Sequence, residues 1–411
     1  MRTRMLLLLL AVILAACTAQ QRKAVPEQAR QAAAGVLLLG SSTGVTSVDA
    51  ATGRVVSETT GVPPLGDWSE VFTTTSSGGR TILEVRDAAT GAVASKTSLP
   101  GELSVRVASA DGSLVALMAP LPDGQSPWTP VPRARTTIVV ADPDGSRDTH
   151  YRLKGNFEPE AFSTFGDSLF LIKFVPATDP VAYKVARLDL AKGKVFPVGT
   201  GQKGVVETMS GTRLEQATSP DGDMLYTLYT TQPAAYAGVH AKNGTPVAFV
   251  HTLSLDEGWA HCVVLPKALW GADPAREAMA VSPDLDLLYV VDTDRDLIAV
   301  MNTEKLEVVL TEPFDIGPVG DGETHAVVAP DGNLFVAAGS KVVAIDTGSL
   351  RPVRTWTMDA AVTALGSGPD GVYVAMPGRV MIIDPWTGRR TASIPSPAGD
   401  GVAYVGMVPA T

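Results

Sequence analysis

The chain has 411 residues, of which 45% are apolar, and it carries a formal net charge of −10. That apolar share is ordinary for a folded globular protein and argues against disorder across the body of the chain. A chain this acidic lacks the basic surface that binds a phosphate backbone, so its charge argues against a nucleic-acid partner.

The first segment has the parts of a secretory signal. Arg2 and Arg4 precede an apolar run over residues 5–16, and small residues follow at its end. A charged start, an apolar middle and a small-residue processing site are the order of parts in such a signal. The apolar run is well short of the ~20 residues that cross a bilayer, so it does not predict a transmembrane helix.

The end of this segment carries a more particular motif, in which Leu14, Ala15 and Ala16 directly precede Cys17. The motif resembles the lipobox of bacterial lipoproteins. The resemblance implies processing at residues 14–16, attachment of fatty-acyl groups such as palmitate to Cys17, and a lipid-anchored protein facing the cell surface or periplasm. A plain secretory signal, in which Cys17 has no role, is the alternative.

The domain organisation follows from these features and from a change in residue pattern at residue 35, where short β-branched runs begin to alternate with turn residues. We expect a signal peptide over residues 1–16, a lipidated cysteine with a flexible tether over residues 17–34, and one folded domain over residues 35–411. Under this organisation the membrane is a partner through the acylated cysteine. Cys262 is the second of the two cysteines, and a lone cysteine of this kind is expected to be a small buried side chain.

The folded domain reads as many short strands joined by turns. Its clearest unit covers residues 325–356, where β-branched and apolar runs are separated by Ala-Pro-Asp-Gly and by Asp-Thr-Gly. Proline fixes φ, aspartate bonds its own backbone and glycine accepts positive φ, so each cluster predicts a turn. The second run is apolar throughout, as in a buried strand, whereas the fourth is polar, as at an exposed edge. Four antiparallel strands repeated radially form a β-propeller blade.

The number of blades follows from the residue that ends each third run. Steps of 38 and 44 residues separate neighbouring copies, close to the ~40–50 residue period of propeller blades. One more unit is needed between residues 189 and 302, which gives eight blades, or seven if residues 65–100 are not an independent blade. The residues that end the third runs are Asp49, Asp87, Asp142, Asp189, Asn302, Asp346 and Asp384.

The first and last strands predict how the ring closes. The domain opens at Val36 with what reads as a second strand, so blade 1 lacks an inner strand. An isolated apolar run at residues 401–406 lacks partners of its own. We therefore expect the C-terminal strand to complete blade 1, which leaves no open edge. A pair of β-sandwiches is the alternative architecture.

The repeat resembles known bacterial propeller families. Its Ser/Ala-Pro-Asp-Gly turn, Leu-x-Val-x-Asp run and Thr-Gly pair resemble YVTN-type and WD40-like repeats, well over residues 277–395 and loosely over residues 36–266. Residues 45–55 and 341–353 look like quinoprotein-type repeats. The chain departs from both families, because no blade has the Gly-His and Trp-Asp pairs of WD40 repeats and the tryptophans do not recur at blade period.

No catalytic motif is found in the sequence. It has no Walker A loop. A Gly-x-Ser-x-Gly match at residues 40–44 and Gly-x-Gly-x-x-Gly matches at residues 199–204 and 366–371 lie among short strand and turn signals, without the helix that must follow in a nucleophile elbow or a dinucleotide-binding fold. The acidic run at residues 292–296 lacks the glycine and distant glutamate of a calcium loop and predicts a solvated turn. His240, His251 and His261 lie near Cys262, but their spacing is not that of a zinc site. No catalytic residue, metal or cofactor is predicted.

Candidate contact residues come from the loops and from the inner strands. Two insertions, residues 121–135 and 232–245, interrupt the blade rhythm and carry Trp128 and Tyr236. Long loops on a rigid scaffold are common binding sites, and exposed aromatic residues are common anchors. His325 opens the inner strand of its blade and is a candidate wall residue of the central channel.

These features favour a lipid-anchored, extracytoplasmic, non-catalytic binding or scaffolding module that holds a protein or a small ligand on a propeller face. This step is an analogy, because a fold does not determine a function. The alternative is an enzyme with a metal- or quinone-dependent site in the central funnel, of lactonase or dehydrogenase type. A quinoprotein-like assembly factor for envelope proteins is a third possibility.

Overall fold

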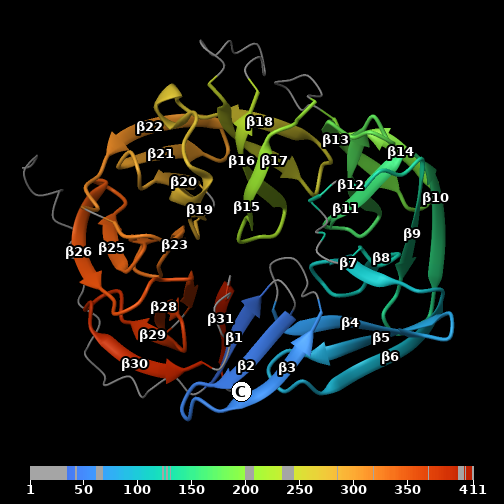
Figure 1. Ribbon diagram of the computed structural model, residues 1–411, viewed down its shortest axis with the longest axis horizontal. Helices are drawn as coiled ribbons and strands as arrows, with labels where there is room; N and C mark the ends of the chain where they lie inside the picture. Colours follow the sequence, from blue (N-terminus) through green and yellow to red (C-terminus); the bar gives the residue numbers. More distant parts are fainter. Residues whose placement is uncertain are drawn as a thin grey trace, which may run out of the picture.

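The computed structural model shows an all-β ring (Figure 1). It describes residues 35–41, 44–61, 68–122, 125, 128–129, 131–199, 208–233, 245–284, 286–317, 319–368, 370–396, 402 and 404–409. Within these ranges the strands form eight sheets, seven with four strands and one with three. The prediction of an eight-bladed β-propeller is confirmed.

We number the sheets as blades in chain order and give their strands from the centre of the ring outwards. Blade 1 is β31 (Tyr404–Pro409), β1 (Gly35–Ser41), β2 (Gly44–Asp49) and β3 (Val55–Thr60), and blade 2 is β4 (Glu70–Ser77), β5 (Arg80–Asp87) and β6 (Val93–Pro100). Blade 3 is β7 (Ser104–Ala108), β8 (Val115–Met118), β9 (Arg135–Ala141) and β10 (Asp148–Lys154), and blade 4 is β11 (Asn156–Phe162), β12 (Ser168–Val175), β13 (Ala182–Asp189) and β14 (Lys194–Pro197).

The second half of the ring is regular. Blade 5 is β15 (Thr212–Thr218), β16 (Met224–Gln232), β17 (Val247–Ser254) and β18 (Ala260–Val264), and blade 6 is β19 (Glu277–Val281), β20 (Leu287–Asp292), β21 (Leu297–Asn302) and β22 (Glu307–Pro313). Blade 7 is β23 (Thr324–Val328), β24 (Leu334–Ala338), β25 (Lys341–Asp346) and β26 (Arg351–Thr357), and blade 8 is β27 (Ala364–Gly368), β28 (Gly371–Met376), β29 (Arg379–Ile383) and β30 (Arg390–Pro395). Two short 3₁₀ helices in the described residues, η2 (Lys267–Leu269) and η3 (Pro274–Arg276), join blades 5 and 6.

The C-terminal strand closes the ring as predicted. β31 pairs with β1 in antiparallel register, with Leu38 opposite Gly406. In Figure 1 the red end of the chain lies beside its blue beginning. The strand covers residues 404–409 and so begins three residues later than the predicted run at 401–406. The innermost edge of blade 1 is therefore made by the end of the chain.

The blade turns explain why one unit was hard to recognise in the sequence. In blade 7 the Asp346 carboxylate accepts the backbone N–H of Ser349 at 2.8 Å, which closes the turn after the third strand. In blade 5 the same place is taken by Ser254, whose hydroxyl oxygen accepts the N–H of Glu257 at 2.9 Å. Serine supplies the acceptor without the Asp or Asn that marks the other units.

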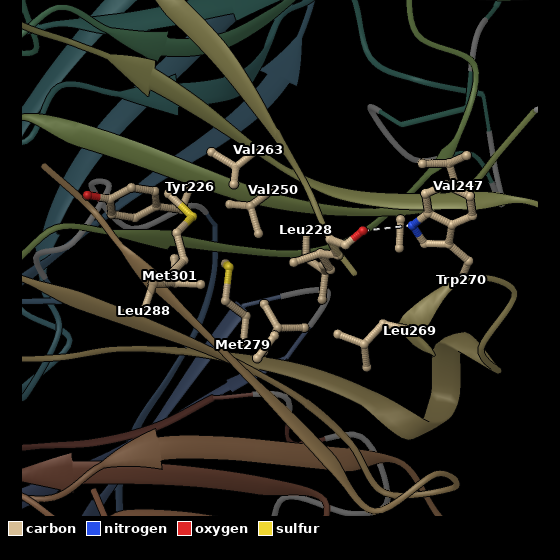
Figure 2. Close-up of a cluster of buried hydrophobic side chains, with 14 residues drawn as sticks. Tyr226, Leu228, Val247, Val250, Val263, Leu269, Trp270, Met279, Leu288 and Met301 are labelled. Carbon is tan, nitrogen blue, oxygen red and sulfur yellow. Dashed lines mark hydrogen bonds between the residues drawn. The ribbon is translucent and has the colours of Figure 1, made fainter. Parts of the chain in front are cut away.

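Apolar side chains fill the space between neighbouring blades. Each of the eight blade interfaces has its own cluster of buried residues. Figure 2 shows the cluster between blades 5 and 6, where Met279 of β19 and Met301 of β21 pack among the aliphatic residues of β16 and β17. At its edge the Trp270 indole donates to the carbonyl of Leu265 at 2.8 Å. The second strands are buried throughout, as β24 shows, whereas the outer strand β26 is mostly exposed.

No helix in the described part of the chain is both long and apolar enough to span a membrane.

Candidate ligand pocket between blades 3, 4 and 5

A pocket of about 390 Å³ lies where three blades meet. Trp128 enters it from the β8–β9 connection of blade 3, Val181 from the β12–β13 connection of blade 4, and Arg213 from the start of β15 in blade 5. Both connections join the second and third strands of their blades, so they emerge on one face of the ring. We call this space the Trp128 pocket. Its lining residues are Trp128, Thr129, Ile172, Phe174, Pro180, Val181, Ala182, Tyr183, Ser210, Gly211, Thr212 and Arg213.

Trp128 stacks on a guanidinium group. The central carbon of the Arg213 guanidinium lies 3.3 Å from the centroid of the Trp128 ring system, a close cation–π contact. The Trp128 side chain remains 48% exposed, whereas only 9% of the Arg213 side chain is exposed. The tryptophan therefore presents one ring face to solvent and covers a buried positive charge with the other.

Behind Arg213 lies a buried carboxylate. Arg213 Nη2 is 3.0 Å from Glu160 Oε1 on β11, so the ion pair bridges blades 4 and 5. The Gln216 amide also donates to Glu160 Oε1, at 3.3 Å. Burial raises the pKa of Glu160, and the Arg213 charge and the Gln216 hydrogen bond oppose that rise. Glu160 is not among the residues that line the pocket.

A second charged group bridges blades 3 and 4. Arg106 Nε lies 2.7 Å from Glu158 Oε1, and Arg133 Nη2 lies 2.7 Å from Glu158 Oε2. Burial lowers the pKa of Arg106, and the Glu158 carboxylate opposes that effect. Together with Glu160 and Arg213 these residues form what we call the charged cluster. It contains three guanidinium groups and two carboxylates.

β-Bulges accompany the charged cluster on three inner strands. The register shifts between Val105 and Val107 on β7, between Pro159 and Ala161 on β11, and between Arg213 and Glu215 on β15. A bulge inserts one residue into a strand and redirects the side chains beside it. Charged side chains of these inner strands consequently lie between blades, where the second and third strands place apolar ones.

The charged cluster leaves hydrogen-bonding capacity unused. The Nε, Nη1 and Nη2 atoms of Arg213 are buried and have no hydrogen-bond acceptor among the described residues, although Nη2 lies in the ion pair. Glu160 Oε2 likewise has no described hydrogen-bond partner. Buried polar groups usually have partners, so exceptions of this kind mark places where a further group can bind.

The opposite wall of the pocket is aromatic. The rings of Phe174 and Tyr183 meet edge to face, with centroids 6.3 Å apart. The Tyr183 hydroxyl donates to the carbonyl of Gly211 at 2.7 Å, which fixes the ring against β15. Burial raises the pKa of Tyr183, so the phenol stays protonated at neutral pH. The pocket thus combines one positive group with largely apolar walls.

Two further inner-strand carboxyl groups lie on the far side of blade 5. Burial raises the pKa of Glu215 to about 7, although its carboxylate accepts the N–H of Met279 at 2.6 Å. Burial, and then the charge of Asp292, raises the pKa of Glu277 to about 8. Both carboxyl oxygens of Glu277 are buried without a described hydrogen-bond partner. Asp292 itself is fully buried, so the turn at residues 292–296 is present but is not solvated at its first residue.

Of the predicted contact residues, Trp128 is the one that the structure places in the pocket. His325 lies on β23 of blade 7, where burial lowers its pKa, whereas the pocket is lined from blades 3, 4 and 5. Tyr236 and the predicted lipobox residues lie outside the described residues; the latter are Leu14, Ala15, Ala16 and Cys17.

The cysteine and histidine predictions are refined by the structure. Cys262 is half-buried rather than fully buried, and it lies opposite His251 in the β17–β18 register. His251 is a core residue, and its burial lowers its pKa to about 3. Across the described residues, no three His, Cys, Asp or Glu side chains are grouped so that they could hold a metal ion.

Arg213, Glu160 and the rest of the charged cluster were not among the residues predicted from the sequence. The one available signal was the segment at residues 158–160, in which two glutamates flank a proline in a run that the blade pattern assigns to a buried inner strand. Charged residues at such a position are rare unless they are paired, so they indicate partners on a neighbouring blade.

Comparison with known proteins gives the fold. No family model and no curated protein matches the sequence. Among solved structures, apo AztD from Citrobacter koseri has a TM-score of 0.57 at 12% identity, over 92% of this chain and 98% of that chain. Sqt1 from Saccharomyces cerevisiae has a TM-score of 0.49 at 12% identity, over 91% of each chain. The dihydro-heme d1 dehydrogenase NirN has a TM-score of 0.47 at 14% identity, over 84% of this chain and 70% of that chain. The likeness to AztD agrees with the propeller ring described above, and at 12% identity it does not extend to an activity.

Proposed function

We propose that the chain is a lipid-anchored, extracytoplasmic binding module that holds its ligand in the Trp128 pocket and does not transform it. The observation that carries this proposal is the pocket itself, enclosed by three blades and flanked by Trp128 and Val181. Its volume lies within the range of about 300–1,000 Å³ that is typical of small-molecule sites. The exposed Trp128 has the character of an anchoring residue.

The residues that line the pocket support binding rather than acid–base chemistry. They supply one guanidinium, from Arg213, and one phenol, from Tyr183, and neither is poised to exchange a proton near neutral pH. The nearest carboxylate, Glu160, is buried in an ion pair behind Arg213. A general acid or base needs a pKa near the working pH and access to the substrate.

Site-specific photo-crosslinking in cells tests the position of the site. Val181 and Phe165 make a matched pair, because both are exposed apolar residues, at 71% and 75%, and they flank opposite ends of β12. A photoreactive amino acid at position 181 is expected to give an adduct with the ligand. The same amino acid at position 165, on the other face of the ring, is expected to give none.

The nature of the adduct distinguishes the two kinds of ligand. A protein partner produces a band of higher mass on a gel, whereas a small ligand produces a discrete mass increment on the intact chain. Equal adducts at positions 165 and 181, or an adduct at position 165 alone, would remove the Trp128 pocket as the binding site.

The membrane anchor is a separate part of the proposal. It is supported by the lipobox-like residues 14–17, which precede a tether of 17 residues, 18–34, before the first strand at Gly35. Stable anchoring takes more than one acyl chain, which a diacylated cysteine supplies. Metabolic labelling with a fatty acid is expected to mark the wild-type chain and not the Cys17→Ser variant. Label retained on that variant would contradict acylation at Cys17.

A further inference from the structure

We propose that the ligand of the Trp128 pocket is a small organic carboxylate with an apolar body, and that its carboxylate pairs with Arg213. This inference rests on the proposed function and adds the chemistry of the ligand. Three observations carry it: the charge balance of the charged cluster, the unused donors of Arg213 and the apolar walls of the pocket.

The charged cluster contains one more positive group than it has negative groups, although each guanidinium lies in an ion pair. The two carboxylates, Glu158 and Glu160, face three guanidinium groups, and Glu158 is shared between Arg106 and Arg133. Arg106, Glu158, Glu160 and Arg213 are largely buried, and an unbalanced charge in such a place is costly. A ligand with a single negative charge would neutralise the cluster. The surplus stands out because the chain as a whole carries a net charge of −10.

Arg213 has the free donors that a carboxylate needs. A guanidinium carries five N–H donors in one plane, and a carboxylate accepts two of them side by side. The one ion pair of Arg213 uses Nη2, and its three nitrogen atoms lack hydrogen-bond acceptors in the described part of the chain. Trp128 covers the flat face of the group, and stacking of this kind leaves the in-plane donors available.

The rest of the pocket is suited to an apolar body. Ile172, Phe174, Val181 and Tyr183 form its walls, and the Tyr183 hydroxyl is already bonded to Gly211. At about 390 Å³ the pocket is at the small end of the range for ligand sites, so it fits a compact acid. Arg213 and the apolar walls together would select a molecule that is negatively charged at one end and apolar at the other.

Calorimetric titration of the purified full-length chain in detergent tests this ligand chemistry. The probes are 3-phenylpropanoate, hexanoate and indole-3-acetate, with 3-phenylpropanamide as the uncharged match of the first. At least one carboxylate is expected to bind, and 3-phenylpropanoate should bind about tenfold or more tightly than its amide, because the amide cannot form the charge-assisted pair. Inorganic phosphate, which lacks an apolar body, should compete poorly.

Variants assign the effect to Arg213. Arg213→Lys keeps the charge and the pairing with Glu160 but loses the planar fork, and it is expected to reduce the preference for carboxylate over amide several-fold. Arg152→Lys, at an exposed position on β10 of blade 3, is the matched control and should change nothing. Trp128→Ala leaves the Glu160 pair in place and should weaken carboxylate and amide alike, which keeps the test valid if the Arg213 variant folds poorly.

Three results would overturn the inference: equal affinity for 3-phenylpropanoate and its amide, no binding of any carboxylate probe at millimolar concentration, or full competition by inorganic phosphate. If a crosslinked adduct forms at position 181 while carboxylate and amide bind equally, the proposed function stands and the carboxylate assignment alone fails. If the adduct is also missing, both fail.

Discussion

The rings of Trp68 and Tyr404 stack face to face, with centroids 3.7 Å apart and planes at 3°. Tyr404 belongs to β31, the strand that closes the ring, whereas Trp68 stands just before β4 in blade 2. A Cβ atom on Gly40 would lie 2.9 Å from the Trp68 ring, so the absence of a side chain on β1 lets the stack form. The last strand is thus held by a side-chain contact with blade 2 as well as by its backbone pairing with blade 1.

This stack predicts a stabilising role for the Tyr404 ring. Tyr404→Ala is expected to lower the free energy of unfolding by at least the ~0.5–1.5 kcal/mol that an aromatic pair contributes beyond its buried area. Tyr404→Phe keeps the ring and should retain most of that stability. Urea denaturation of the three proteins measures the difference. A larger loss in the Phe variant than in the Ala variant would show that the hydroxyl, and not the stack, matters.

Removal of the closing strand should have a larger effect than loss of the stack. A chain that ends at residue 403 leaves β1 without its partner on one side and opens the ring. We expect a marked fall in the thermal unfolding temperature and aggregation through the exposed strand edge. A chain that ends at Pro409 is the control and should unfold like the wild type. Unchanged unfolding of the shorter chain would contradict the closure of the ring by β31.

The ion pair between Arg213 and Glu160 predicts that removing one partner destabilises the fold far more than removing both. Arg213→Ala leaves a buried carboxylate without its partner and is expected to cost about 3–5 kcal/mol of unfolding free energy. The double change Arg213→Met and Glu160→Leu removes both charges and should recover much of that loss. Arg147→Ala, from an exposed pair with Asp142, should change stability by about 0–1 kcal/mol. Chemical denaturation measures the unfolding free energy of each variant. A lower value for the double variant than for Arg213→Ala would contradict the ion pair between Arg213 and Glu160.

The buried carboxyl groups predict a decline in stability with rising pH. The folded-state pKa of Glu277 is raised to about 8 and that of Glu215 to about 7, while both fall to about 4.3 in the unfolded chain. The folded protein therefore holds more protons than the unfolded chain between these limits. The contribution of these two groups to stability is fully present below about pH 4.3 and is lost progressively as the pH rises toward 8, by up to about 1.4 kcal/mol per pH unit for each group.

Glu277→Gln tests this pH dependence, because the amide is uncharged at every pH. The variant should show a shallower decline of unfolding free energy between pH 5 and pH 8, measured by urea titration at each pH. Glu304→Gln, at an exposed turn position in the same blade, provides the matched control and should follow the wild type. Parallel curves for the wild type and Glu277→Gln would show that Glu277 titrates alike in both states.

The sequence could predict the ring because each blade repeats a local signal. Turns such as the one closed by Asp346 need particular residues at fixed places, and the unpaired apolar run at the C-terminus implied a partner at the start of the domain. The fifth unit was harder to recognise, because Ser254 makes the same turn with a different residue. The turns could therefore be recognised in the sequence wherever one residue type dominates a turn position.

The charged cluster could not be predicted from the sequence in the same way. Which face of an inner strand meets the neighbouring blade depends on its register, and a one-residue bulge moves the following side chains to the other face. The bulges at Pro159–Ala161 and Arg213–Glu215 have no local sequence marker. The pairing of Glu160 with Arg213 joins residues far apart in the chain and depends on that register.

The position of β1 has a mechanical consequence. β1 begins at Gly35, where the preceding segment meets the ring, and it is hydrogen-bonded to β31 on one side and to β2 on the other. A pull on Gly35 that is directed along the strand loads both ladders in shear instead of peeling their hydrogen bonds one at a time. The ring should therefore resist force applied at Gly35, the residue through which the proposed membrane tether would pull on it.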